Sequence, residues 1–255
     1  MDDRIELQLD GSIARLTIRR ADKLNALDAA MVDAIQPLCR QIERSAARVV
    51  ILTGAGKAFS AGGDIAAWSQ SSPEDFGRHW VRDGHTAFDA LARLTVPVIA
   101  VLNGHALGGG FELATCADLR IAERHVKIGL PETGIGIIPG WSGSQRAVQR
   151  FGAQVIRRMA LFGEVFTAEE GLALGLVDHL TDTGGGMALA ETVAARLMGR
   201  SGRATELTKM LINAAEGEEG PRVLEALAGS IAAGSDDLKE GLRAFSEKRK
   251  PDFGR

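Results

Sequence analysis

Cysteine is scarce in this sequence, with only Cys39 and Cys116 among 255 residues. Both stand among apolar neighbours in segments expected to be helical, so we expect two buried thiols rather than a disulfide. No apolar stretch opens the chain, and we therefore expect no signal peptide. The longest aliphatic runs, such as Val98–Leu102, are far too short to cross a bilayer. These absences favour a cytoplasmic protein.

An excess of positive charge is also lacking. The chain has 30 Lys and Arg residues against 33 Asp and Glu residues, which gives a formal net charge of −3. This balance gives no electrostatic reason to expect binding to nucleic acid or to an anionic membrane. The length suffices for one large domain, or for a core with a smaller appendage.

Several common site motifs are missing. The cluster Gly54–Gly56 lacks the third glycine of a dinucleotide-binding loop, because Phe59 stands at that position, and no P-loop is present. The five histidines are scattered, none forms a His-Glu-x-x-His pair, and we expect no metal site. His105 is expected to be packed or partly solvated. No Gly-x-Ser-x-Gly elbow indicates a serine hydrolase.

Strands and helices are predicted to alternate along the first two thirds of the chain, which indicates an α/β fold. The predicted strands cover residues 14–18, 49–52, 98–102 and 119–122, and the predicted helices cover 28–43, 83–94 and 110–117. Asp28 is a plausible cap for the first helix, whereas Pro37 predicts a kink or break within it. Ligands in such folds gather at the carboxyl ends of strands, where glycine-rich loops follow here.

The chain is predicted to divide near a polar, glycine-rich joint at 181–186. Residues 1–186 would form the core with the active site, and residues 187–255 a helical region. The helices expected there cover 187–199, 203–215, 221–233 and 236–249. Within the core, serine, proline and glycine interrupt the segment Trp68–His85, which predicts a mobile loop.

Two glutamates follow glycine-rich segments. Glu112 comes directly after Leu107–Phe111, which contains three consecutive glycines, and Glu132 follows Gly129–Pro131. A third glycine-rich loop covers 59–64. Two carboxyl groups can divide acid and base work, and exposed backbone N–H groups in such loops can hold an oxyanion. The alternatives are glycines needed only for tight turns and glutamates that are merely solvated. The apolar helix around Glu112 argues against a solvated side chain, and the combination of two acids with these loops suggests chemistry next to a carbonyl group.

Six motifs in order extend this pattern over essentially the whole chain. They are Lys23–Leu27, Lys57–Ile65, Asn103–Glu112, Pro131–Gly140 with Gln145-Arg146, Ala173–Asp178, and Glu240-Gly241 through Lys248–Pro251. In these motifs the chain resembles the enoyl-CoA hydratase/isomerase (crotonase) superfamily. The resemblance implies a spiral of β-β-α turns, followed by a C-terminal helical region that serves trimerisation and completes the CoA site.

The resemblance also implies roles for the residues of the site. The backbone N–H groups of Ala61 and Gly109 match the oxyanion hole of the family. Glu112 and Glu132, which are 132 − 112 = 20 residues apart, match the two catalytic glutamates of its hydratases. The expected reaction is the hydration of a 2-trans-enoyl-CoA. An enoyl-CoA isomerase and a non-catalytic acyl-CoA-binding homologue remain alternatives.

Coenzyme A is part of the substrate in this family, so no separate cofactor is expected. The resemblance assigns its binding to Lys23, Ala26, Leu27, Ala61, Gly62, Gly63, Asp64 and Ile65, largely through backbone groups, and to Phe245 and Lys248. The last two would close over the nucleotide from a neighbouring subunit of a homotrimer or of a hexamer built as a dimer of trimers. The bulky side chains of Trp68, Trp80, Phe111 and Trp141 suggest a preference for short or branched acyl groups.

Overall fold

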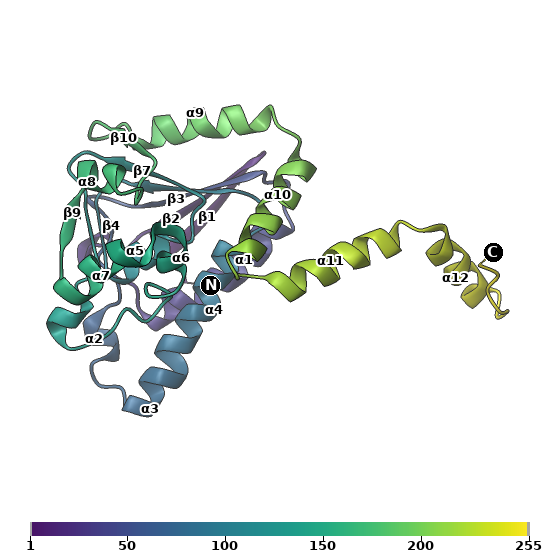
Figure 1. Cartoon of the computed structure of the whole chain (residues 1–255), viewed down its shortest axis with the longest axis horizontal. Coiled ribbons are helices and arrows are strands. Elements are labelled where there is room, and N and C mark those ends of the chain that lie inside the picture. Colours follow the sequence, from purple (N-terminus) through teal and green to yellow (C-terminus); the bar gives the residue numbers. More distant parts are fainter. Residues whose placement is uncertain (1, 254–255) are drawn as a thin grey trace. The chain divides into compact units, whose positions relative to one another are not determined.

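Two sheets organise the first part of the chain in the computed structural model, which describes residues 2–253 (Figure 1). The larger sheet has the strand order β1-β2-β3-β5-β7-β10. Its strands are β1 (Ile5–Asp10), β2 (Ile13–Ile18), β3 (Val49–Gly54), β5 (Val98–Leu102), β7 (Leu119–Glu123) and β10 (His179–Thr181). β1 and β2 are antiparallel, and all other neighbours are parallel.

The smaller sheet has the order β4-β6-β8-β9. Its strands are β4 (Ala58–Ser60), β6 (His105–Leu107), β8 (Lys127–Gly129) and β9 (Val165–Thr167). The pairs β3–β4, β5–β6 and β7–β8 each contribute one strand to either sheet before the chain turns into helical structure. This repeated β-β-α turn confirms the α/β class and the spiral that were expected from the sequence.

The central strands are buried on both faces because helices cover the larger sheet from two sides (Figure 1). On β3, Val50 and Leu52 join the core that α1 (Ala29–Glu43) and α4 (Arg82–Ala92) cover. Val49 and Ile51 alternate with them and pack toward α9 (Gly186–Met198). The period of two along a strand thus explains the continuous apolar runs in the sequence.

Further helical segments connect these elements. They are η1 (Ala21–Lys23), α2 (Ile65–Trp68), α3 (Pro73–Asp75), the π-helix η2 (Phe76–Val81), α5 (Gly109–Ala114), η3 (Glu132–Ile135), α6 (Arg146–Phe151), α7 (Ala153–Phe162), α8 (Ala168–Ala173), α10 (Gly202–Ala215), α11 (Gly220–Ala233) and α12 (Asp236–Ser246). Cys39 and Cys116 are buried and form no disulfide, as predicted. No helix among residues 2–253 is long and apolar enough to span a membrane.

Two local predictions were wrong. α1 continues through Pro37 without a break, because its apolar face stays buried on both sides of the proline. The segment predicted as a mobile loop is largely helical. Ser72 caps α3 through its hydroxyl, which accepts from the N–H of Asp75 at 3.1 Å, and Pro73 occupies the first helical position. Both residues therefore start a helix, as they do in many proteins.

The chain separates into two compact units, one ending at Lys209 and the other beginning at Met210. The division lies beyond the predicted one at residue 186, because α9 packs on the larger sheet and belongs to its core. The second unit contains the end of α10 together with α11 and α12. Its helices were predicted, whereas its role in oligomerisation and in the CoA site stays a prediction.

Asn25 ties the segment before α1 to the loop after β3 and to the start of β4. It is fully buried, with a φ angle of 57°. Its amide group donates to the carbonyl oxygens of Ala55 and Ala58 at 2.9 and 2.7 Å, and its side-chain oxygen accepts from the N–H of Arg20 at 2.9 Å. Asparagine tolerates the left-handed conformation and supplies all three hydrogen bonds.

We therefore expect Asn25→Ala to lower the free energy of unfolding by about 2–4 kcal/mol, because it removes one buried and two partly buried hydrogen bonds to backbone groups. Urea denaturation would measure the change. Asn25→Asp is the matched comparison, since it keeps the acceptor for Arg20 but loses the two donated bonds. A loss below about 1 kcal/mol in Asn25→Ala would contradict this account.

Candidate active site

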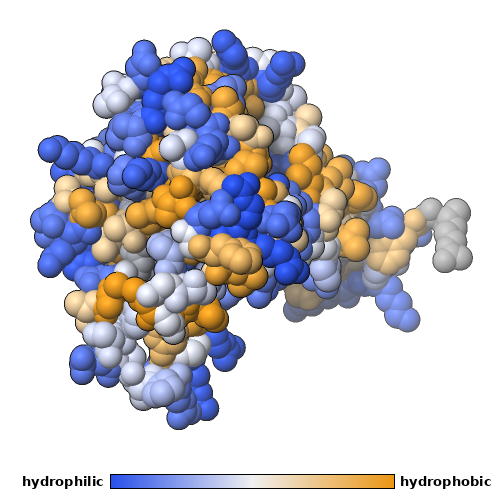
Figure 2. All heavy atoms as spheres, turned by 60° about the vertical axis from the view of Figure 1, so that its left-hand side comes forward, coloured by the Kyte–Doolittle hydropathy of each residue, from blue (hydrophilic) through white to orange (hydrophobic). Residues whose placement is uncertain are grey.

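One cavity in the first unit brings together the glutamates and glycine-rich loops that stood out in the sequence. Its volume is about 220 Å³. The lining residues are Ala61, Gly62, Gly63, Ile65, Trp68, Phe76, Trp80, Gly108, Gly109, Glu112, Pro131, Glu132, Ile135, Ile137, Ile138, Gly140 and Trp141. On the side of this unit that carries α2, α7 and β9, hydrophobic patches lie between hydrophilic residues (Figure 2). The cavity is thus an apolar pocket with two carboxyl groups in its wall.

Glu112 is buried on α5, with 2% of its surface exposed. Its Oε1 accepts two hydrogen bonds of 2.7 Å, from the backbone N–H groups of Trp141 and Gly143. Burial raises the pKa of Glu112 to about 8, and the nearby charge of Glu132 acts in the same direction. The two N–H groups oppose this shift, since they stabilise the carboxylate. Glu112 is therefore held in one orientation and titrates near neutral pH.

Glu132 begins η3, directly after Pro131. Both of its carboxyl oxygens are buried, and neither has a hydrogen-bond partner among the described residues. Burial raises the pKa of Glu132 to about 7. A buried carboxyl group without a partner is costly to the fold and calls for an explanation. Its place in the cavity wall leaves both oxygens available to a bound molecule.

The N–H of Ala61 does not point into the cavity as a free donor, because it donates to the carbonyl oxygen of Leu24 at 3.0 Å. This corrects the expectation that Ala61 supplies the oxyanion hole. The N–H of Gly62 donates to Ser60 Oγ at 3.2 Å. The next residue, Gly63, differs from Ala61 and Gly62, because its N–H has no hydrogen-bond partner among the described residues. Both glycines line the cavity.

Gly63 lies beside Gly109. Leu27 pairs with Gly63 in a parallel bridge, in which the Leu27 N–H donates to Gly62 and the Leu27 carbonyl accepts from Asp64. The N–H of Gly63 therefore faces away from Leu27. A Cβ atom on Gly109 would lie 3.3 Å from this nitrogen. Gly109 opens α5, where the first N–H groups lack intrahelical acceptors. Two backbone donors thus lie together in the cavity wall.

Trp141 forms an apolar wall of the cavity. Its ring centroid lies 4.8 Å from that of Trp80, and its Nε1 donates to the Trp80 carbonyl oxygen at 2.9 Å. The indole fits only because two neighbours are glycines. A Cβ atom on Gly84 would lie 1.9 Å from Trp141 Nε1, and one on Gly109 would lie 2.7 Å from the ring. Phe111, by contrast, packs in the core against Phe151 rather than lining the cavity.

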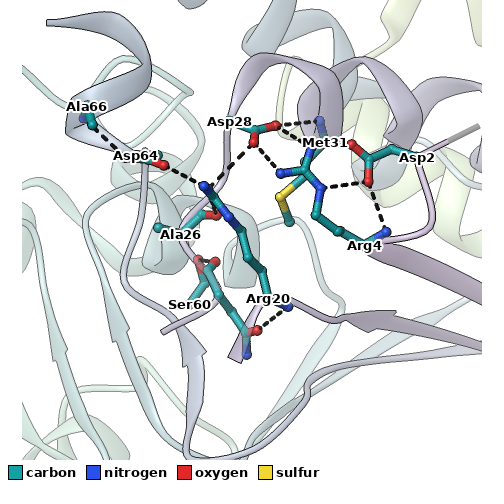
Figure 3. A network of polar contacts seen from close by, with 10 residues as sticks. Asp2, Arg4, Arg20, Ala26, Asp28, Met31, Ser60, Asp64 and Ala66 are labelled. Atoms are coloured by element: carbon teal, nitrogen blue, oxygen red, sulfur yellow. Dashed lines mark hydrogen bonds and ion pairs between the residues drawn. The ribbon is translucent and has the colours of Figure 1, made fainter. Parts of the chain in front are cut away.

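Polar contacts join the predicted CoA-binding segments to each other (Figure 3). Arg20 lies between two carboxylates, 2.8 Å from Asp64 and 3.6 Å from Asp28, and it donates to the Ala26 carbonyl at 3.0 Å. Asp64 also caps α2 through the N–H of Ala66. The segments 23–27 and 61–65 therefore lie side by side, and Leu27 is fully buried where it pairs with Gly63.

The remaining predicted residues have simple environments. His105 is exposed and accepts from the N–H of Lys127, which agrees with its expected structural role. Phe245, 85% exposed, and Lys248 lie in the second unit, and their contact with CoA stays a prediction. Among residues 2–253, no group of three or more His, Cys, Asp or Glu side chains could hold a metal ion.

Known proteins are similar to this chain in both sequence and fold. A family model described as Enoyl-CoA hydratase/isomerase matches residues 8–255. The chain is 33% identical to crotonyl-CoA hydratase of Syntrophomonas wolfei over 98% of each chain, and 34% identical to short-chain-enoyl-CoA hydratase of Clostridium acetobutylicum over 97% of this chain and 96% of that one. The structure of enoyl-CoA hydratase from Bacillus anthracis matches with a TM-score of 0.80 and 33% identity, covering 98% of this chain and 99% of that one.

The protein is therefore an enzyme of the crotonase superfamily, with the crotonase fold. Within it, the chain belongs to the enoyl-CoA hydratase/isomerase family. An acyl-CoA substrate is consistent with this family.

The raised pKa of Glu112 predicts how stability depends on pH. Its ordinary value is 4.5, so the folded state binds this proton more tightly than the unfolded chain does. The resulting stability is fully present below the unfolded pKa and is lost as the pH rises through about 8. Glu112→Gln keeps an oxygen for the two N–H donors but cannot ionise. We therefore expect its free energy of unfolding, relative to wild type, to increase from about pH 6 to about pH 9.

Chemical denaturation at several pH values would measure this difference. Glu225→Gln, at an exposed position on α11, is the matched control and should show no such trend. A constant difference between Glu112→Gln and wild type over this range would contradict the raised pKa.

Proposed function

We propose that this enzyme hydrates 2-trans-enoyl-CoA thioesters to 3-hydroxyacyl-CoA thioesters. The observation that carries the proposal is the pairing of two buried carboxyl groups in one apolar cavity, beside two backbone N–H groups that have no acceptor among residues 2–253. An isomerase of the same family needs no second carboxyl group to activate water. The names of the relatives, crotonyl-CoA hydratase and short-chain-enoyl-CoA hydratase, support the same activity.

The thioester oxygen binds between the N–H groups of Gly63 and Gly109. Negative charge develops on this oxygen when a nucleophile adds at C3, and preorganised donors stabilise that charge. The N–H of Gly109 lies at the start of α5, where the unpaired amide groups add a favourable electrostatic field. Gly63 replaces Ala61 in this role, because the N–H of Ala61 is already engaged by Leu24.

The two glutamates share the proton transfers. Glu112, as the carboxylate, accepts a proton from water while the water oxygen forms a bond to C3. Glu132, as the acid, delivers a proton to C2, and the π electrons of the double bond form that C–H bond. Afterwards Glu112 carries the proton, and exchange with solvent restores the pair. The raised pKa values of both groups allow one proton to reside on either carboxyl group near neutral pH.

The apolar wall favours short acyl groups. Trp68, Trp80 and Trp141 line a cavity of about 220 Å³, which leaves little room for a long chain. The CoA moiety binds along the adjacent segments 23–27 and 61–65. As in the family, Phe245 and Lys248 of a neighbouring subunit close over its nucleotide in a homotrimer or hexamer.

Replacing either glutamate by glutamine tests the proposed reaction. We expect Glu112→Gln and Glu132→Gln each to lower kcat with crotonyl-CoA by about 10²- to 10⁴-fold, because each removes one proton-transfer group. Both variants should still bind a CoA ester, which calorimetry would measure. Loss of the conjugated absorbance measures turnover. Glu225→Gln serves again as the control.

Three outcomes would contradict the proposed reaction or its mechanism. Near-wild-type turnover in both variants would exclude the glutamate pair as acid and base. If the wild-type enzyme converts 3-enoyl-CoA but leaves a panel of 2-enoyl-CoA thioesters unchanged, isomerisation is the activity. Tight binding of all these esters without conversion would indicate a non-catalytic acyl-CoA-binding protein.

Backbone esters test which N–H groups form the oxyanion hole. Incorporation of the matching α-hydroxy acid at position 63 replaces the N–H of Gly63 by oxygen and should lower kcat by about 10²- to 10³-fold. The same change at Ala61 removes the bond to Leu24, so we expect a loss of stability of about 1 kcal/mol and a smaller effect on kcat. A larger loss of kcat at Ala61 than at Gly63 would reverse the assignment.

A further inference from the structure

The hydrogen bonds that orient Glu112 come from a backbone segment with an unusual conformation. Trp141 and Gly143 are two residues apart, yet their N–H groups converge on the same oxygen, Glu112 Oε1, each at 2.7 Å. Such convergence arises when the backbone curls into a small concave arrangement of N–H groups. Ser142, between the two donors, has a φ angle of 81°.

A positive φ angle is unfavourable for serine. The side-chain Cβ atom disfavours this region, which glycine enters readily. A non-glycine residue persists there only when its surroundings hold it. Ser142 is 4% exposed, and its carbonyl oxygen also accepts from the N–H groups of Gln145 and Ala147 at 3.2 and 3.3 Å. The strained residue thus lies between the two donors to Glu112, and its carbonyl oxygen connects them to the start of α6.

His85, on α4, contacts the side chain of this strained residue. Its Nδ1 lies 2.9 Å from Ser142 Oγ. Burial lowers the pKa of His85, Arg146 acts in the same direction, and Asp89 opposes both. In the neutral imidazole, Nδ1 can therefore accept a hydrogen bond from the hydroxyl group of Ser142.

η2 and α4 hold the same loop at two further points. The Trp80 carbonyl accepts from Trp141 Nε1, and Asp89 pairs with Arg146 at 2.6 Å. The bond between His85 and Ser142 lies between these two in sequence order. Of these three contacts, the hydrogen bond of His85 is the one made to Ser142, the residue with the strained backbone.

We propose that His85 and Ser142 are positioning residues, whose hydrogen bond holds the backbone so that Trp141 and Gly143 orient Glu112 for proton transfer. This rests on the proposed function, in which Glu112 activates water. Neither His85 nor Ser142 is among the residues that line the cavity, so both act through Glu112. Orienting one carboxylate oxygen leaves the other free to meet water, and small displacements of such a group reduce rates strongly.

Kinetics of variants test the proposal. We expect Ser142→Ala and His85→Ala each to lower kcat by about tenfold, with KM within about twofold of wild type. His85→Asn should retain most of kcat, because its amide reaches the hydroxyl from a position close to Nδ1. Ser144→Ala, two residues further on and exposed, is the matched control and should keep the wild-type kcat.

A double variant separates the role of the backbone from that of the hydroxyl. Glycine adopts a φ angle of 81° without support, so His85→Ala combined with Ser142→Gly should recover most of the kcat that His85→Ala loses. Absence of this recovery would overturn the proposal. The same holds if His85→Ala and Ser142→Ala lower only the melting temperature and leave kcat unchanged.

A second readout does not require turnover. In enzyme with ¹³C-labelled glutamate carboxyl groups, the Glu112 signal is identified by its loss in Glu112→Gln. Because the two N–H groups lower the pKa of Glu112, Ser142→Ala should make this signal titrate at a higher pH than in wild type. An unchanged titration would overturn the positioning role. If the titration shifts but no enoyl-CoA is hydrated, the proposed function fails while the positioning of Glu112 stands.

Discussion

The burial of two carboxyl groups beside a glycine-rich backbone is the constraint on which this structure depends. Burial raises the pKa values of Glu112 and Glu132 toward neutrality, and the charge of Arg146 opposes this rise only in part at Glu112. Two backbone N–H groups hold Glu112, whereas Glu132 has no partner among the described residues. This asymmetry fixes the orientation of Glu112 and leaves the carboxyl group of Glu132 available to a bound molecule. The strands and helices of the first unit bring four segments of the chain around this pair. These segments are 61–68, 76–80, 108–112 and 131–141.

Much of this architecture could be predicted from sequence because it depends on local periodicity. Runs such as Val49–Leu52 report burial on both faces of a strand, and the spacing of apolar residues in α1 reports one buried face. The glutamates were identifiable because each follows glycines at a strand end. Their meeting in one cavity follows from the β-β-α turns, which return the chain to the same edge.

Other features depend on contacts that a linear pattern does not contain. The donor at Gly63, rather than Ala61, is determined by which N–H groups Leu24 and Leu27 leave unpaired. The helix after Trp68 was missed because serine and proline mark helix starts as well as turns. The contact of His85 with Ser142 joins residues 57 positions apart. Its proposed positioning role depends on the positive φ angle of Ser142, which a sequence pattern does not show.

The slot that holds Trp141 has a consequence for how this pocket can vary. A side chain at position 84 and the indole in its present place exclude each other, because even a single added carbon would overlap the ring. The two positions are therefore coupled. A larger residue at 84 requires that residue 141 move or become smaller, and such a change would alter the wall of the cavity at the same time.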